Sequence, residues 1–461
     1  MLRALRREPG FYPRLIRLAL PVVLQNLITT SLGFADTFMV GLLGNAEMAA
    51  VTAANVPVFI IQLCIFGFQS GMAILVSQYW GRSDTENISR CFGIALYSVT
   101  ALSLLVSFLC VVFPSQVMGL ITPNPDLIAL GTGYLRVVAL GVVFNAISTI
   151  YIGLQRSTEF PTFGMIVFGA SMAVNLLLNY VLIFGKFGAP ALGIVGAAAA
   201  TALSRLMEFI IVVVFALRDR RLTLHRKCIL RPGKRIFRSF IKYSTPVVLN
   251  ETLWGTGNSM LTVIMGHMAN SQDMLAAYSL VGNVHKLSSI LCFGLASSAS
   301  VIVGKEIGMG RDRDHVQSVS WTLLLLSLLA GGCVAVLLFI LLPTFFLPVL
   351  FPLFQLSPGA TEVATCMAIL FSLFMPLMSF DITNVTGVLR AGGDSRTAAI
   401  IDIVPLWCVA IPLMALTGLV LDAPVWVVCV AMLGENFIKC PLGLARFRTK
   451  KWINDITRNE E

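Results

Sequence analysis

Four oxygen-bearing residues in the first half of the chain have the types and spacing of a site for a small cation or a proton. Asp36 lies inside the first long apolar stretch, where an ionisable group costs at least about 2.5 kcal/mol. Asn175 and Asn179 are four residues apart, so a helix places both amides on one face. Thr201 ends the small-residue run 196–201, itself a predicted close-packing surface. We expect these four to bind H⁺ or Na⁺. The alternatives are a helix-end aspartate and amides that only link helices.

A second set of charged residues interrupts the apolar stretches of the second half. Glu251, Asp381 and Asp402 are each isolated among apolar neighbours, and Lys286 follows His285 in the middle of another stretch. We expect these four residues to form a second site or to contact substrate, with Lys286 as the cationic partner of one acid. A permanent ion pair between Glu251 and Lys286 is the structural alternative.

Two further charged pairs have the spacing of neighbours on one helix face. Arg205 and Glu208 are three residues apart, and Glu435 and Lys439 are four apart. We interpret both as local pairs or as side chains that reach toward the membrane surface, with no transport role.

The composition requires a membrane around these residues. Hydrophobic residues make up 57% of the 461, whereas charged residues make up only 12%, and a soluble protein of this size cannot bury so much apolar surface. The net charge of +10 does not indicate nucleic-acid binding, because it is concentrated in one short segment and at the two ends of the sequence. Within 218–242 the basic residues are Arg218, Arg220, Arg221, Arg226, Lys227, Arg231, Lys234, Arg235, Arg238 and Lys242.

Twelve apolar stretches are long enough to cross about 30 Å of hydrocarbon. Lys and Arg gather in the loops after the even-numbered stretches, so both termini are predicted to be cytoplasmic in a plasma (inner) membrane. The stretches lie near 14–40, 47–79, 91–113, 128–154, 161–184, 191–217, 238–267, 274–304, 317–343, 360–390, 397–419 and 424–445.

The two halves of the chain repeat each other. The segment that begins Pro21-Val22-Val23-Leu24 recurs 225 residues later as Pro246-Val247-Val248-Leu249. Six spans in each half give the halves the same orientation, so the repeat is parallel. The predicted division is an N-lobe at 1–217, a basic cytoplasmic linker at 218–236 and a C-lobe at 237–461. Pro21 and Pro246 interrupt the first helix of each lobe and are predicted hinges, with fixed kinks as the alternative.

Three segments, taken together, resemble the multidrug and toxic compound extrusion (MATE) family. Residues 36–41 (DTFMVG) resemble its first-helix segment, 175–185 with 196–201 are similar to its helix 5–6 signature, and 387–396 (GVLRAGGDSR) resemble its tenth-helix exit motif. The resemblance extends over about 14–445. It implies an all-α integral membrane fold, with twelve transmembrane helices in two pseudo-symmetric six-helix bundles arranged as a V.

The resemblance also implies a function and site residues. Asp36, Asn175, Asn179 and Thr201 match a cation site of some members, although others have a second Asp where this chain has Asn179. Glu251 and Asp381 resemble acids of the seventh and tenth helices in other branches. The implied activity is drug export driven by inward flow of Na⁺ or H⁺.

We therefore expect a multidrug efflux antiporter that exports amphiphilic, often cationic organic compounds by alternating access. It should act as a monomer in the lipid bilayer, with no cofactor beyond the coupling ion and no nucleic-acid partner. The alternative is a lipid-linked saccharide flippase of the same superfamily, which should have a basic cavity. An enzyme is not expected, because no paired aspartates and no Ser/His arrangement occur in the sequence.

Overall fold

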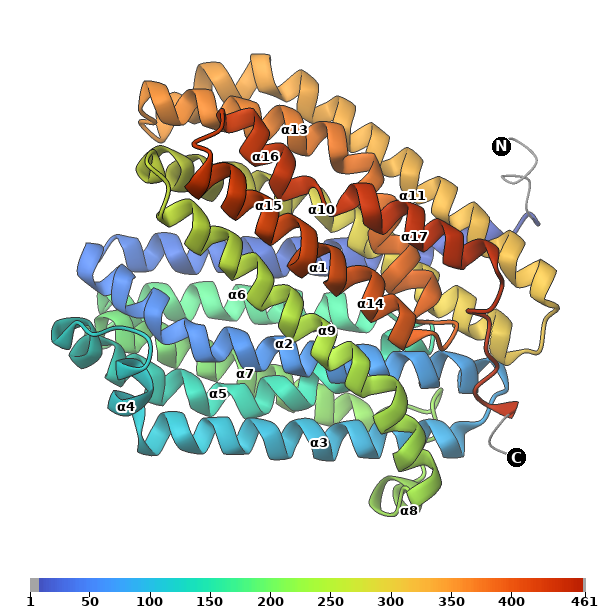
Figure 1. The fold of residues 1–461 in the computed structure, drawn as a ribbon. Coiled ribbons are helices and arrows are strands. Elements are labelled where there is room, and N and C mark those ends of the chain that lie inside the picture. The colour runs from blue at the N-terminus through green and yellow to red at the C-terminus, as the bar shows by residue number, and fades with distance from the viewer. Residues whose placement is uncertain (1–7, 459–461) are drawn as a thin grey trace. The chain divides into compact units, whose positions relative to one another are not determined.

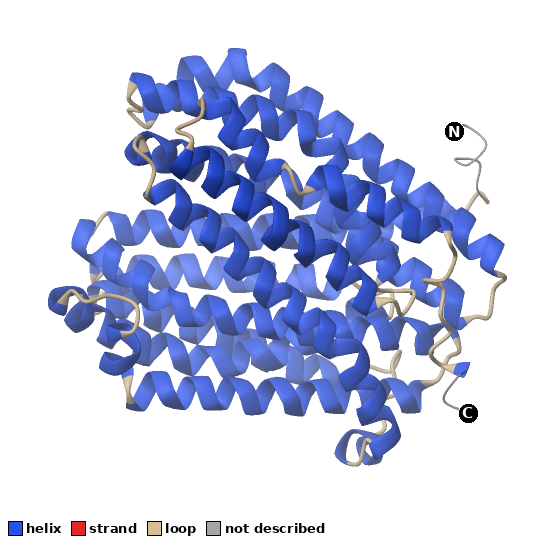
Figure 2. Cartoon of the chain, viewed as in Figure 1, coloured by secondary structure: helices blue, strands red, loops and turns tan. Residues whose placement is uncertain are grey.

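The computed structural model describes residues 8–458, and every regular element within that range is a helix. Figures 1 and 2 show long helices joined by short loops. The first half contains α1 (Phe11–Gly41), α2 (Asn45–Gly81), α3 (Thr85–Val112), α4 (Pro114–Gly119), α5 (Pro125–Ser157), α6 (Thr162–Phe184), α7 (Gly193–Arg218) and α8 (Arg226–Leu230).

The second half has the same long helices with more interruptions. It contains α9 (Lys234–Gly266), α10 (Ser271–Gly308), α11 (Arg313–Leu341), η2 (Leu342–Leu350), α12 (Phe351–Leu353), α13 (Pro358–Ile382), η3 (Thr383–Leu389), α14 (Ser395–Pro405), η4 (Leu406–Ala410), α15 (Ile411–Ala415), η5 (Leu416–Val420), α16 (Val425–Leu433) and α17 (Asn436–Arg448). The elements marked η are π-helical.

Eleven helices in the described part of the chain are long and apolar enough to cross a membrane. Four predicted spans are compound, because consecutive segments continue one another over Arg313–Leu353, Pro358–Leu389, Ser395–Val420 and Val425–Arg448. The predicted span at 238–267 corresponds to α9, the twelfth long helix. Its first turns contain Lys234, Arg235 and Arg238, and its interior contains Asn250 and Glu251, so it is less apolar than the others.

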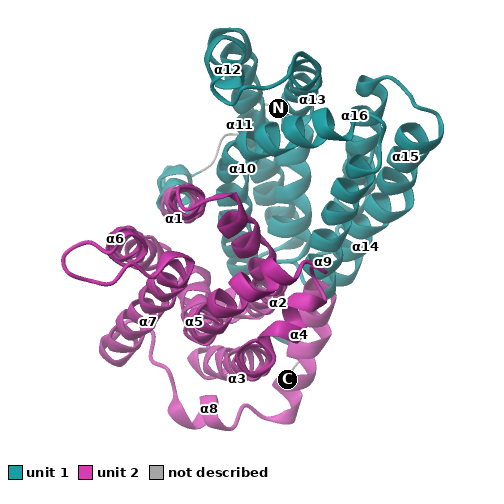
Figure 3. Cartoon of the chain, turned by 90° about the vertical axis from the view of Figure 1, so that its left-hand side faces the viewer, with its two compact units in different colours: residues 1–19, 249–461 teal, residues 20–248 magenta. Residues whose placement is uncertain are grey.

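The chain packs into two compact units (Figure 3). One consists of residues 20–248, and the other of residues 8–19 with 249–458. We call them the first-half unit and the second-half unit. The predicted lobes divide the chain at the linker, whereas these packing units divide it within α1 and within α9. Each of these two helices therefore contributes residues to both units.

The π-helical turns are confined to the second half of the described chain. Pro405 and Pro412 flank η4, and because proline lacks an N–H group, it breaks the regular hydrogen-bond pattern there. The segment η3 begins two residues after Asp381. Such turns widen a helix locally and change the direction of its side chains.

Glycines and alanines allow helices of the first-half unit to approach closely. Ala198 and Ala200 in the predicted packing run are fully buried, and Gly196 lies against the backbone of α6 at Leu182. A Cβ atom on Gly67 of α2 would lie 2.7 Å from the Cα atom of Val248 on α9. The backbones of α2 and α9 are thus in contact at this point.

We expect Gly67→Ala to destabilise the protein, because the added methyl group has no space beside Val248 and overpacking costs typically about 1–3 kcal/mol. Gly33 is a matched control, since it is also helical and a Cβ atom there would have no neighbour within 4 Å. Gly33→Ala should preserve or raise the melting temperature in detergent, whereas Gly67→Ala should lower it. Equal melting temperatures for the two variants would contradict the close approach.

Candidate functional site

Three of the four predicted cation ligands lie together inside the first-half unit. Asn179 Nδ2 donates to Asp36 Oδ1 at 2.6 Å and to Asn175 Oδ1 at 2.9 Å. Asp36 belongs to α1, and both asparagines belong to α6, where their four-residue spacing places them on one face. Both asparagines are 1% exposed. The structure thus joins one carboxylate to two buried amides.

Thr201 does not join this cluster by a hydrogen bond among the described residues, although it is half-buried on α7. The cluster does contain one hydrogen-bond acceptor that is not used. Asn179 Oδ1 is buried and has no hydrogen-bond partner in the described part of the chain, and buried amide oxygens usually have one. Carboxylate and amide oxygens are the donors that hard cations prefer. The donor set therefore fits a small hard cation, and Asp36 alone can take a proton.

A ladder of amides connects α2 to α5 in the same unit, and our sequence reasoning missed it. Amide side chains recur every seven residues along α2, at Asn55, Gln62 and Gln69. Their partners on α5 are, in order, the Tyr134 hydroxyl at 3.2 Å, the Asn145 side chain, and the Thr149 carbonyl at 2.9 Å. The regular spacing of amides within an apolar helix is the signal that could have revealed this ladder. A seven-residue period keeps the amides on one face of α2, toward a single neighbouring helix.

The polar face of α6 also extends further than predicted. Ser171 lies four residues before Asn175, is 1% exposed, and its hydroxyl has no hydrogen-bond partner among the described residues. The spacing of Ser171, Asn175 and Asn179 places all three on one side of the helix. The candidate site is thus one end of a buried polar stripe.

In the second-half unit, Glu251 pairs with Arg390 and not with Lys286. Arg390 Nη1 lies 2.7 Å from Glu251 Oε1, and the arginine side chain is only 2% exposed. Arg390 stands at the very end of the predicted span 360–390. The expected role of Lys286 as a partner is wrong: it lies on the exposed side of α10 and forms no ion pair within residues 8–458. Ser289 and Ile290 face the interior instead.

Asp402 is held by two side chains from other helices. Asn250 Nδ2 donates to its Oδ2 atom at 2.9 Å, and Lys439 Nζ lies 2.8 Å from its Oδ1 atom. Lys439 also lies 3.0 Å from Glu435 Oε2. The predicted local pair of Glu435 and Lys439 is present, but Lys439 is 3% exposed and bridges two acids. It therefore does not reach toward the membrane surface.

Asp381, unlike Asp402, forms no ion pair with another described residue. It lies at the end of α13, and its Oδ1 atom is buried without a hydrogen-bond partner among the described residues. The same holds for both amide atoms of Asn384, three residues later in η3. A Cβ atom on Gly443 of α17 would lie 2.7 Å from Asn384 Nδ2 and 4.0 Å from Asp381 Oδ1. The glycine leaves room for both side chains, which have unused hydrogen-bonding capacity.

The predicted hinge prolines both lie within continuous helices. Pro21 is inside α1 and Pro246 is inside α9. Each is within a few residues of the point where its helix passes from one compact unit to the other, at 19–20 in α1 and at 248–249 in α9.

The Glu251–Arg390 pair gives a test by double substitution. Arg390→Met and Glu251→Gln should each lower the melting temperature, since removing one partner of a buried pair typically costs about 3–5 kcal/mol. The double variant should recover most of that loss, because neither charge remains unpaired. Lys286→Met is the control and should behave as the native protein. Additive losses in the double variant would show that the pair is not coupled.

Comparison with known proteins shows which family this chain resembles over its length. The sequence model of the MatE family matches residues 21–181 and 246–416. The two matched segments begin at Pro21 and Pro246, which confirms the internal repeat. The chain is 24% identical over 453 residues to the probable multidrug resistance protein NorM of Thermotoga maritima, covering 96% of this chain and 94% of that protein. It is 23% identical over 422 residues to the multidrug export protein MepA of Staphylococcus aureus, covering 89% of each.

Solved structures show the same fold at lower identity. A MATE transporter in complex with MaL6 is 18% identical and superposes with a TM-score of 0.84, over 98% of this chain and 99% of that one. A MOP superfamily transporter from Pyrococcus furiosus is 17% identical with a TM-score of 0.83, over 97% of each chain. The predicted fold class, with twelve transmembrane helices, is confirmed. Because the family match extends over both halves of the chain, this protein belongs to the MatE family of multi-pass membrane transporters.

Proposed function

We propose that this protein is a cation-coupled antiporter that exports amphiphilic, often cationic organic compounds. The main observation is the Asp36 carboxylate, which is bonded to a buried amide pair within a membrane-spanning helix. An acid in such a place is costly and marks an ion pathway by default. The names of the NorM and MepA relatives, which refer to multidrug resistance and multidrug export, support the drug-export part.

The hydrogen bonds of Asp36 suggest how the coupling ion acts. The ionised carboxylate accepts a short, charge-assisted bond from Asn179. A proton on Asp36 weakens that bond, and Na⁺ competes with the amide hydrogens for the same oxygen. Either event loosens the link between α1 and α6. Export would follow if the substrate-loaded and ion-loaded states favour opposite openings of the transporter.

The path of α1 suggests how this change reaches the rest of the molecule. Asp36 and Pro21 are on the same helix, about 22 Å apart along its axis. Pro21 lies beside the point where α1 passes between compact units, and Pro246 has the corresponding position in α9. Bending at these two prolines, where a backbone hydrogen bond is missing, would allow alternating access.

The donor set supports H⁺ or Na⁺ as the coupling ion. Asp36 supplies the one carboxylate of the cluster, which is enough for a proton. Na⁺ would need amide oxygens as well, and Asn179 Oδ1 is a free acceptor on the same amide group. Thr201, half-buried on α7, remains a proposed further ligand. In the second half, Glu251, Asp381 and Asp402 remain proposed contacts for a second ion or for a cationic substrate.

A flippase for lipid-linked saccharides is supported less well. Such a protein needs unpaired basic side chains for pyrophosphate, but the buried Arg390 and Lys439 are both bonded to acids. Arg205 is likewise bonded to Glu208, at 2.9 Å.

We further propose that the protein works as a monomer in a plasma (inner) membrane, with its termini in the cytoplasm and with no cofactor beyond the coupling ion.

The direct test uses purified protein in liposomes with ethidium as the transported cation. A Na⁺ gradient and a pH gradient are imposed separately, and ethidium fluorescence follows uptake or release. We expect one of the two gradients to drive ethidium against its concentration difference. Failure of both gradients with folded protein, or equal transport by empty liposomes, would contradict the antiporter assignment.

Substitution of Asp36 tests the site itself. Asp36→Asn should fold and insert, because it removes a charge from apolar surroundings, and should lose gradient-driven transport by at least about tenfold. Asp126→Asn is the matched control, since Asp126 is exposed in the first turn of α5, and it should transport normally. Normal transport by well-folded Asp36→Asn would remove this residue from the coupling site.

A further inference from the structure

Residues 449–458, which we call the strap, follow α17 and fold back as largely non-helical chain. Such segments are usually poorly ordered unless they are tied to the rest of the fold. Here Trp452 is completely buried, and Ile453, Ile456 and Thr457 are each at most 5% exposed. This degree of burial indicates a specific docking site.

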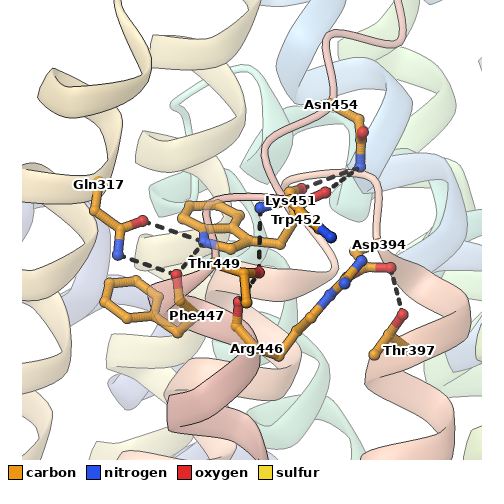
Figure 4. A network of polar contacts seen from close by, with 9 residues as sticks. All are labelled: Gln317, Asp394, Thr397, Arg446, Phe447, Thr449, Lys451, Trp452 and Asn454. Atoms are coloured by element: carbon orange, nitrogen blue, oxygen red, sulfur yellow. Dashed lines mark hydrogen bonds and ion pairs between the residues drawn. The ribbon is translucent and has the colours of Figure 1, made fainter.

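The indole of Trp452 anchors the strap (Figure 4). Its Nε1 atom donates to Gln317 Oε1 at 3.2 Å and to the Phe447 carbonyl at 3.0 Å. Its ring stacks on Phe447 with 5.7 Å between centroids, and Phe447 stacks on Trp321 at 5.6 Å. The strap is thereby fixed to α11 and α17.

The strap in turn contacts the loop between η3 and α14, residues 390–394, which is the central part of the GVLRAGGDSR motif at 387–396. The backbone N–H of Asn454 donates to the Gly392 carbonyl at 2.9 Å. A Cβ atom on Gly392 would collide with the Trp452 ring, and Gly393 has a φ of +79° with Ile456 packed against it. Both glycines are therefore needed for the strap to dock on this loop.

The same loop sets the position of Arg390. The backbone N–H of Gly393 donates to the Arg390 carbonyl at 2.9 Å, and the Arg390 N–H donates to the Val385 carbonyl at 3.2 Å. Arg390 thus begins the turn that the strap contacts at Gly392 and Gly393. Its side chain extends toward Glu251, with Nη1 2.7 Å from Glu251 Oε1. The direction of this buried guanidinium depends on a backbone that residues 449–458 hold in place.

We propose that the strap positions Arg390 against Glu251, with Trp452 as the positioning residue. Docking of the strap keeps Glu251 paired, and loosening it frees the Glu251 carboxyl for a proton or a cationic substrate. The consequence for transport rests on the proposed role of Glu251 as part of a second site. The geometric claim does not, because it concerns only how accessible the Glu251 carboxyl is.

The test measures the reaction of carboxyl groups with dicyclohexylcarbodiimide in liposomes, with each modified residue identified by mass spectrometry. The reagent attacks protonated carboxyls in apolar surroundings, so a carboxylate paired with Arg390 is protected. Trp452→Ala should raise modification of Glu251 several-fold. Trp426→Ala is the matched control, because Trp426 is 60% exposed on α16, and it should leave Glu251 unchanged. Asp36, in the other unit, is the internal reference in each sample.

Arg390→Met sets the upper limit of Glu251 modification, and Trp452→Ala should add nothing in that background if it acts through Arg390. If Trp452→Ala does not fold, Gly392→Ala replaces it, since its single methyl group displaces the Trp452 ring. Unchanged Glu251 modification in a folded variant overturns the proposal. Equal increases at Glu251 and Asp36 also overturn it, as they indicate general loosening. None of these outcomes depends on whether the protein transports ethidium.

Discussion

Hydrocarbon offers no hydrogen-bond partner, so every polar side chain within these helices must find one inside the protein. Many hydroxyls meet this requirement locally, by donating to a carbonyl one turn earlier, as Ser204 does to Ala200 and Ser372 does to Ala368. Amides and charged groups also use neighbours within one helix, as Arg205 does with Glu208, but the contacts of Asp36, Glu251 and Asp402 reach other helices. The positions of these longer contacts determine which helices are tied together and where unused polar capacity remains.

The two halves meet this constraint in different ways despite their common origin. At the repeat offset of 225, Asp36 corresponds to Leu261, which is buried in an apolar core. Conversely, Asn26 corresponds to Glu251, which requires Arg390 as a counter-ion. The first half surrounds Asp36 with amides and pairs the buried Glu208 with Arg205, whereas in the second half Glu251 and Asp402 are each paired with a buried base. This difference supports separate roles for the two clusters, since an amide donor is displaced more readily than a permanent cation.

The glycines of the GVLRAGGDSR motif at 387–396 show how a sequence signature can reflect packing instead of chemistry. Gly387 allows η3 to approach α10, where a Cβ atom would lie 2.7 Å from the Ala296 carbonyl oxygen. Gly392 and Gly393 allow residues 449–458 to dock. Between them lies Arg390, whose guanidinium pairs with Glu251. The small residues thus shape the surroundings in which one long side chain is held.

The sequence by itself determined the membrane fold, because hydrophobic span lengths and an internal repeat depend only on local composition and order. It also determined that Asn175 and Asn179 would share one helix face, through their i, i+4 spacing, whereas their contact with Asp36 on another helix depends on tertiary packing. The partner of Glu251 was decided only by the tertiary structure. Lys286 and Arg390 are equally plausible in sequence, but the rotation of α10 turns Lys286 outward, and the turn after η3 directs Arg390 inward. Pairings between residues more than a hundred positions apart depend on helix rotation and on loop geometry, and neither is encoded in the periodicity of a single segment.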